Sequence, residues 1–242
     1  MMTNLSKKYS KANPKENNPV YLCKFCGTKF QKEKTLTTHM CVKKQRHIDI
    51  NTAGSRFGLR AFQKFYELTM QSKKLKSIDE FIDSPYYIDF AKFGNHLAAL
   101  KPLYIDKYIE FVIMNGVKLK DWTKDFVYDT YIIDVIKKEP ANSATDRTIT
   151  EIIEWCDKNH IPFNDFFFSI SANEAAYLIR TGRISPWVLY LSPSGEQLMS
   201  RFNEEHGKMI AGIIDAAYWM KVFKKSGDDV EYIRTLLEQS GL

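Results

Sequence analysis

The chain has 242 residues, of which 44% are hydrophobic, so it is long enough for one packed domain with an appendage. No stretch approaches the apolar length of a membrane span, and the polar, lysine-rich N-terminus carries no secretory signal. The net charge of +6 is unevenly distributed: residues 1–76 hold 17 Lys and Arg against 4 Asp and Glu, whereas residues 77–242 hold 18 against 25. We therefore expect a basic N-terminal part that attracts phosphate, an acidic remainder and no membrane partner.

Residues 1–19 begin the basic part. They are polar, contain two prolines and carry four lysines. Because such a segment cannot bury enough apolar surface to fold, we predict a disordered basic tail.

The segment 20–47 carries the pattern with the most chemical content. It consists of two cysteines, an aromatic residue, a leucine and a histidine at fixed spacing: Cys23, Cys26, Phe30, Leu36 and His39. Over residues 21–47 the pattern resembles a zinc finger of the Cys-Cys-His-His type. The resemblance implies a small ββα unit around one structural Zn²⁺, with the aromatic residue and the leucine as its core.

The fourth zinc ligand departs from that family. Lys43 occupies the position where a second histidine is expected, which leaves Cys41 and His47 as candidates. On a helix, residues two apart are separated by about 200°, so Cys41 requires the helix to unwind directly after His39. His47 lies roughly 12 Å further along a continuous helix and requires a larger break. We predict Cys41 as the fourth ligand, with His47 as the alternative.

The same segment provides candidate contacts to nucleic acid. The base-reading positions of a standard finger correspond to Lys32, Thr35 and Thr38. Threonine discriminates weakly between bases, and one finger covers only about 3 base pairs. The remaining candidates would contact phosphate: Lys24, Lys29, Lys34, Lys43, Lys44 and Arg46. The pattern predicts largely sequence-neutral binding to nucleic acid, with DNA as the expected form.

After a linker at residues 48–55, the pattern is helical throughout residues 56–242. The first helix places apolar residues on one face: Phe57, Ala61, Phe65, Leu68 and Met70. A capping box that begins at Ser77 and Ser-Pro pairs at Ser185 and Ser192 are among the signals that mark helix starts. Further helices are predicted at about 86–100, 103–115, 122–138, 145–159, 172–181, 186–191, 194–203, 205–213, 215–225 and 228–240. The predicted fold class is mainly α, with a ββα zinc finger followed by an irregular all-helical domain.

A second DNA-binding motif is weighed at Ala175–Tyr190, which resembles a helix-turn-helix in outline. Arg183 stands where such motifs place an apolar residue, so a plain helical hairpin is favoured. Arg180, Arg183 and Arg201 are predicted to form a basic spot on the acidic domain. Cys156 and His160 have a spacing that can hold a metal, but a buried thiol beside a surface histidine is favoured.

No enzyme signature is present: the chain lacks a Gly-rich phosphate loop, a dinucleotide fingerprint, a Gly-x-Ser-x-Gly elbow and a His-Glu-x-x-His motif. The leading hypothesis is a zinc-binding, nucleic-acid-binding accessory protein in transcription, replication or packaging, whose acidic helical domain docks a protein partner. The alternative is a protein-binding adaptor or structural component in which zinc is only a staple. A helical nuclease or hydrolase with an unrecognised site is the third hypothesis.

Cysteine usage and overall composition indicate the cellular compartment and the kind of genome that we expect for this protein. Three of the four cysteines lie in the finger, which favours metal binding in a reducing, intracellular compartment such as the cytoplasm of a bacterial or host cell. Lysines outnumber arginines 27 to 8, and this bias is associated with AT-rich genomes. A tailed-phage accessory protein would fit it.

Overall fold

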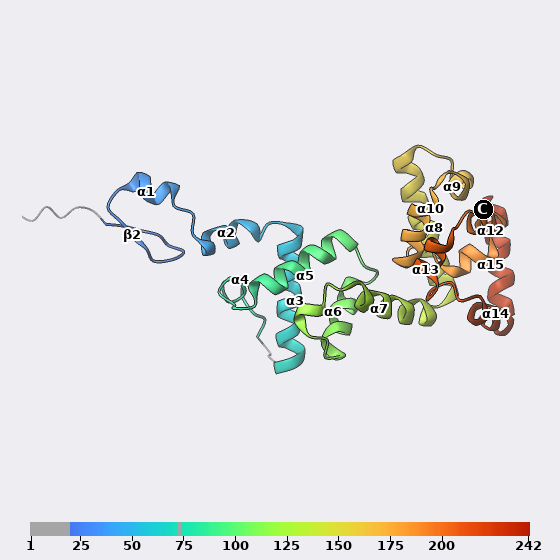
Figure 1. The fold of residues 1–242 in the computed structure, drawn as a ribbon. Coiled ribbons are helices and arrows are strands. Elements are labelled where there is room, and N and C mark those ends of the chain that lie inside the picture. Colours follow the sequence, from blue (N-terminus) through green and yellow to red (C-terminus); the bar gives the residue numbers. More distant parts are fainter. Residues whose placement is uncertain (1–19, 72–73) are drawn as a thin grey trace, which may run out of the picture. The chain divides into compact units, whose positions relative to one another are not determined.

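The computed structural model describes residues 20–71 and 74–242 (Figure 1). The chain divides into two compact units, Met1–Asn51 and Thr52–Leu242. The tail predicted for residues 1–19 lies outside the described residues. The predicted fold class is confirmed, because the described residues form fifteen α-helices and one sheet of two strands.

The first unit contains a hairpin and two short helices. Strands β1 (Tyr21–Leu22) and β2 (Lys29–Phe30) pair antiparallel, with Tyr21 opposite Phe30. Helix α1 spans Glu33–Thr38 and helix α2 spans Val42–Asp49. Cys23 is the one buried residue among residues 20–51. Residues 20–51 therefore have no hydrophobic core of the kind that stabilises a larger domain.

The second unit is helical. Its α-helices are α3 (Ala53–Met70), α4 (Ile78–Ile82), α5 (Tyr87–Leu100), α6 (Ile105–Met114), α7 (Asp125–Lys138), α8 (Ala141–Asn159), α9 (Phe166–Ser169), α10 (Ala172–Arg180), α11 (Pro186–Leu191), α12 (Pro193–Ser200), α13 (Glu204–Ile210), α14 (Ala216–Lys225) and α15 (Gly227–Ser240). Two 3₁₀ turns, Leu119–Asp121 and Phe163–Asp165, complete it. The predicted helices from residue 86 onward agree with these bounds to within a few residues.

Helices α3 and α5 cross at close range through glycines (Figure 1). A Cβ on Gly94 would overlap the backbone of Gly54 and Gly58, and one on Gly58 would lie 2.7 Å from the Phe90 carbonyl oxygen. The buried face of α3 is therefore centred on Gly54, Gly58 and Ala61. The predicted apolar face is wrong in part, because Met70 is 68% exposed and Phe57 is only half-buried.

Aromatic side chains fill the core beside this crossing. Phe90, Phe93 and Trp122 are almost completely buried, and the rings of Phe90 and Phe93 meet Trp122 at centroid distances of 5.7 and 5.0 Å. Both contacts are close to edge-on, which is the favourable arrangement for aromatic quadrupoles. The indole N–H of Trp122 donates to the Val117 carbonyl at 2.8 Å, so its burial leaves no polar hydrogen unsatisfied.

A buried ion pair holds the turn between α10 and α11. The Arg147 guanidinium bonds both carboxylate oxygens of Glu139, at 3.0 and 2.6 Å, and the Glu139 side chain is only 4% exposed. Arg147 also donates to the carbonyls of Gly182 and Arg183. Gly182 adopts a φ of 79°, a left-handed conformation that favours glycine.

Among the described residues, no helix is both long enough and apolar enough to cross a bilayer.

The α3–α5 crossing predicts that Gly58→Ala destabilises the full chain by about 1–3 kcal/mol, because the added methyl group meets backbone atoms that cannot move aside. Gly207 in α13 is a matched control, since a Cβ there meets nothing within 4 Å. Gly207→Ala should leave stability unchanged or raise it by about 0.5–1 kcal/mol. Chemical denaturation followed by circular dichroism measures both; equal stability of the two variants would contradict the close crossing.

Candidate metal centre

The hairpin of the first unit positions two of the four candidate ligands. After β1, the backbone N–H of Cys23 donates to the Thr28 carbonyl at 2.9 Å, and the N–H of Gly27 donates to the Cys23 carbonyl at 2.8 Å. Gly27 closes this turn with a φ of 73°. The Cys23 and Cys26 thiols are thereby held on one side of a tight turn, as a structural zinc site requires.

The other two ligands lie at the junction between α1 and α2. Helix α1 ends at Thr38, and His39 is extended, with φ −66° and ψ 123°. Cys41 is also extended and is the N-cap of α2, where its sulfur accepts a hydrogen bond from the Lys44 backbone N–H at 3.4 Å. The break that a Cys41 ligand needs is present, and it occurs directly after α1.

These four side chains converge. One ligand atom from each of Cys23, Cys26, His39 and Cys41 lies within 4.8 Å of all the others. The Cys26 sulfur and the His39 Nε2 atom are 3.3 Å apart. Three sulfurs and one imidazole nitrogen are a donor set that structural zinc sites use. Within residues 20–71 and 74–242 this is the one group of side chains that could hold a metal ion. The structure therefore supports a metal site at this position, and it does not identify the ion.

His47 is directed elsewhere. Its Nδ1 atom contacts the Lys43 carbonyl at 2.9 Å, one turn back along α2, and its ring packs on Phe25 at a centroid distance of 4.9 Å. Cys41, rather than His47, therefore completes the group that the structure brings together.

The thiols differ in their ease of ionisation. Hydrogen bonds from the hydroxyl and the backbone N–H of Thr28, with a smaller contribution from His39, lower the pKa of the Cys26 thiol to about 6. At Cys41, partial burial raises the pKa of the thiol. Zinc binds the thiolate form, so Cys26 is ready for a metal at neutral pH, whereas at Cys41 the metal itself must displace the proton.

Two side chains next to the ligands, Lys44 and Thr28, contact His39 and Cys26; the spacing of the ligands did not reveal these contacts. The Lys44 ammonium donates to the His39 carbonyl at 3.1 Å, and the Thr28 hydroxyl lies 3.1 Å from the Cys26 sulfur. The expected core residues Phe30 and Leu36 are only half-buried, and the Phe30 ring lies 4.8 Å from the His39 ring. Ligand contacts thus replace much of the apolar packing in this unit.

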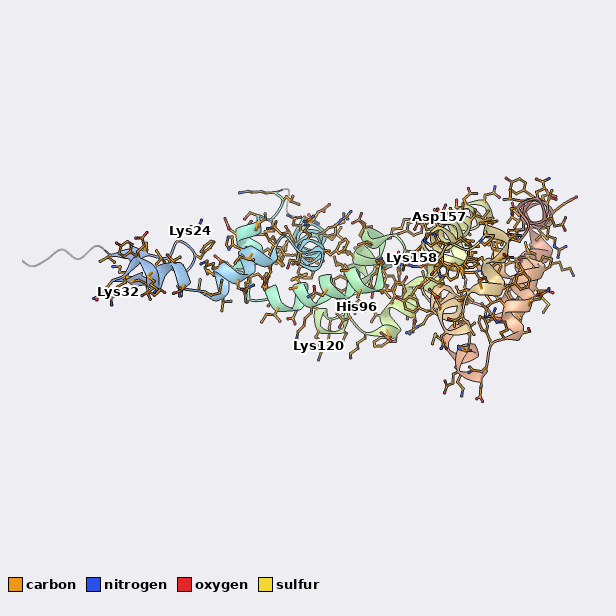
Figure 2. The ribbon with its side chains drawn as sticks, turned by 90° about the horizontal axis from the view of Figure 1, so that it is seen from above. Lys24, Lys32, His96, Lys120, Asp157 and Lys158 are labelled. Carbon is orange, nitrogen blue, oxygen red and sulfur yellow. The ribbon has the colours of Figure 1, made fainter. Side chains whose placement is uncertain are left out.

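The candidate nucleic-acid residues surround the metal group. Lys24, Lys29, Lys32, Lys34, Thr35 and Thr38 are exposed, whereas Lys43, Lys44 and Arg46 are half-buried. Figure 2 shows Lys24 and Lys32 on different sides of the unit. The Thr38 hydroxyl donates to the Lys34 carbonyl at 3.1 Å, which commits it to the helix backbone. Only Lys34, Thr35 and Thr38 lie in α1; the other candidates lie in the hairpin, at the N-cap of α1 and in α2.

Comparison of the chain with known protein families, curated proteins and solved structures finds no match. The resemblance to a zinc finger therefore rests on the ligand group together with the adjoining hairpin and helix.

The segment Ala175–Tyr190, which resembles a helix-turn-helix in outline, does not provide a helix that could read DNA. Trp187, Val188 and Leu189 of α11 are buried, so this helix cannot enter a DNA groove. The basic spot predicted for Arg180, Arg183 and Arg201 is also wrong. Arg180 pairs with Asp129 at 3.0 Å, Arg183 pairs with Glu151 at 2.8 Å, and Arg201 donates to the carbonyls of Phe167 and Ile170 at 2.8 and 2.6 Å.

Cys156 and His160 do not form a metal pair in the structure. The Cys156 thiol is buried and donates to the Pro162 carbonyl at 3.8 Å. His160 is exposed and ends α8 in a left-handed conformation, with a φ of 56°. The buried thiol beside a surface histidine, favoured from the sequence, is what the structure shows.

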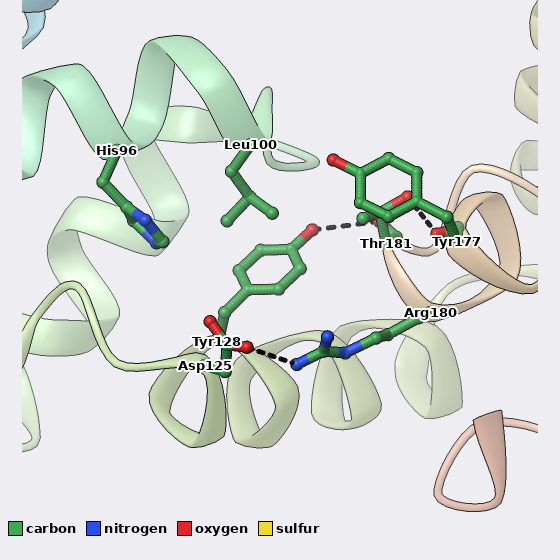
Figure 3. Close-up of a pocket in the computed structure, with 7 residues that line it drawn as sticks. All are labelled: His96, Leu100, Asp125, Tyr128, Tyr177, Arg180 and Thr181. Carbon is green, nitrogen blue, oxygen red and sulfur yellow. Dashed lines mark hydrogen bonds and ion pairs between the residues drawn. The ribbon is translucent and has the colours of Figure 1, made fainter. Parts of the chain in front are cut away.

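A small cavity of about 170 Å³ lies between α5, α7 and α10 (Figure 3). Arg180 bonds Asp125 at 3.2 Å across it, and the Tyr128 hydroxyl donates to the Thr181 carbonyl at 2.9 Å. The His96 Nε2 atom is buried without a hydrogen-bond partner among the described residues. Burial lowers the pKa of His96 and so favours the neutral imidazole. Among the lining residues, no nucleophile is paired with a base.

The geometry predicts that Cys41→Ser lowers the zinc content of the purified full chain after dialysis against a mild chelator, because a hydroxyl replaces a thiolate ligand. His47→Gln and Cys156→Ser are controls for the alternative ligand and for loss of a distant thiol. Both should retain about one zinc per chain by elemental analysis. Retention of zinc in Cys41→Ser with its loss in His47→Gln would contradict the assignment.

Proposed function

We propose that the chain is a zinc-binding accessory protein whose basic first unit contacts nucleic acid and whose helical unit docks a protein partner. The observation that carries this proposal is that a metal-ligand group and a concentration of positive charge share one short segment. Residues 20–51 contain seven Lys and Arg against two Asp and Glu. Clustered positive charge binds phosphate by releasing counterions, whatever the base sequence.

The distribution of the charge supports phosphate contact rather than base reading. Helix α1 has six residues, and its Thr37 and Thr38 hydroxyls bond carbonyls of the preceding turn. Threonine gives little discrimination between bases even when its hydroxyl is available. Lysines that lie on different sides of the unit suit the backbone of a nucleic acid, which offers phosphates over a wide surface (Figure 2). We therefore propose binding with little sequence preference, with DNA as the expected form.

The proposed biological setting is a step in transcription, replication or packaging. A phage origin is supported only by the lysine-rich composition of the chain.

A second candidate function has its own supporting observation. Val20, Leu22, Met40, Val42 and Ile48 are 62, 56, 54, 66 and 51% exposed on the same small unit. Exposed apolar side chains that lie together in a contiguous patch mark sites of protein contact. The alternative proposal is therefore a protein-binding adaptor in which zinc serves as a staple.

The nucleic-acid proposal predicts a steep fall of affinity with salt, measured by fluorescence anisotropy with a labelled DNA duplex and with its RNA counterpart. A triple Lys29→Glu, Lys32→Glu, Lys34→Glu variant should weaken binding at least about tenfold and reduce the slope of log K against log salt by roughly 2–3, since each phosphate contact contributes about 0.9. The zinc content of this variant should be unchanged.

A triple reversal at Lys221, Lys224 and Lys225, all exposed in the helical unit, is the matched control. It changes the net charge equally and should leave the salt slope near that of the wild type. Equal loss of binding in the two triple variants would show a response to overall charge alone, and would favour the adaptor.

A further inference from the structure

A groove separate from the metal centre lies in the helical unit. It has a volume of about 540 Å³ and lies between the C-terminal half of α3, the start of α5 and the turn that follows α6. This volume is within the roughly 300–1,000 Å³ of ligand-binding clefts. The groove is not part of the sequence-based predictions, because it joins residues that are far apart along the chain.

The floor of the groove is largely apolar. Phe65, Phe90 and Trp122 line it, and the indole N–H of Trp122 is committed to the Val117 carbonyl. The Thr69 hydroxyl donates to the Phe65 carbonyl at 2.6 Å. An occupant therefore meets the aromatic side chains of Phe65, Phe90 and Trp122, which suits an apolar side chain.

The rim presents exposed apolar groups. Met70 and Tyr86 line the groove and are 68 and 53% exposed. Met70 is the last residue of α3, so its side chain is not needed to hold the helices together. Unbranched methionine adapts to partners of varied shape, and it recurs on surfaces that bind peptides.

The charge beside the groove is positive. Lys118 lines it, and Lys120 lies two residues further along the chain (labelled in Figure 2). Both lysines are exposed, and neither forms an ion pair within the described residues. The hydrogen bond from Lys124, at 2.7 Å, lowers the pKa of Asp121, and the charges of Lys120 and Lys118 lower it further. Three lysines against one aspartate leave an excess of positive charge beside this apolar surface.

We propose that this groove binds a segment of a partner protein in which an aromatic or aliphatic anchor is followed by acidic residues. The anchor fills the aromatic floor beside Met70, and the acidic residues face Lys118 and Lys120. The N-terminal tail of the chain itself is a poor occupant, because residues 1–19 carry four lysines and one glutamate. This inference deepens the partner-docking part of the proposed function and is independent of zinc and nucleic acid.

The test is selection of a random peptide library displayed on phage against the immobilised full-length protein, followed by affinity measurement with the enriched peptides. Enriched sequences should combine an aromatic residue or leucine with an excess of Asp and Glu. Met70→Asp should weaken their binding at least about tenfold, because it places an unpaired carboxylate against the apolar anchor of the peptide. Lys118→Glu with Lys120→Glu should weaken it about threefold or more at low salt, mainly through the association rate.

Met220→Asp is the matched control, because Met220 is 66% exposed on α14 and lies outside the groove. It should bind the peptides as the wild type does. Absence of enrichment, enrichment without acidic residues, or equal binding by Met70→Asp and Met220→Asp would overturn the proposal. Concentration-dependent self-association that Met70→Asp abolishes would assign the groove to a second copy and would also overturn it. Peptide binding by a chain that binds no nucleic acid would support the groove and reject the nucleic-acid proposal.

Discussion

The first unit depends on the convergence of three thiols and one imidazole. Among residues 20–51 only Cys23 is buried, and the expected core pair, Phe30 and Leu36, is half-exposed. So little apolar burial cannot offset the conformational entropy of ordering the segment. A metal bound by the four side chains would supply the missing free energy, as it does in other small metal-dependent units. The positions of the surrounding lysines follow from that convergence.

The two units are stabilised by different physical means. In the helical unit, stability comes from close backbone approach at Gly54, Gly58 and Gly94 and from an aromatic core around Trp122. The groove beside Trp122 is the exposed edge of that core. Under the proposed function, the basic first unit would contact nucleic acid and the groove of the helical unit would contact a protein partner. Such a division of roles fits an accessory protein that links a nucleic acid to other machinery.

Local features of the sequence predicted much of this structure. The spacing of the cysteines and the histidine identified the candidate ligand group. Cys41 was preferred to His47 as the fourth ligand because it requires a smaller break in the helix after His39. Helix starts at Ser77, Ser185 and Ser192 are set by capping hydrogen bonds and by proline in the first turn, which depend only on neighbouring residues. Long-range contacts were not predictable in this way. The buried face of α3 includes two glycines that the approach of α5 makes necessary. Arg183 pairs with Glu151, 32 residues away, and Arg147 donates to the carbonyl of Gly182, 35 residues away.

The central claim is that Cys23, Cys26, His39 and Cys41 together bind one zinc ion. X-ray absorption spectroscopy at the zinc edge of the full-length protein tests it most directly, because it counts sulfur and nitrogen neighbours. The account predicts three sulfurs at about 2.3 Å and one nitrogen at about 2.0 Å. Two sulfurs with two nitrogens, or a purified protein that binds no zinc, would contradict it.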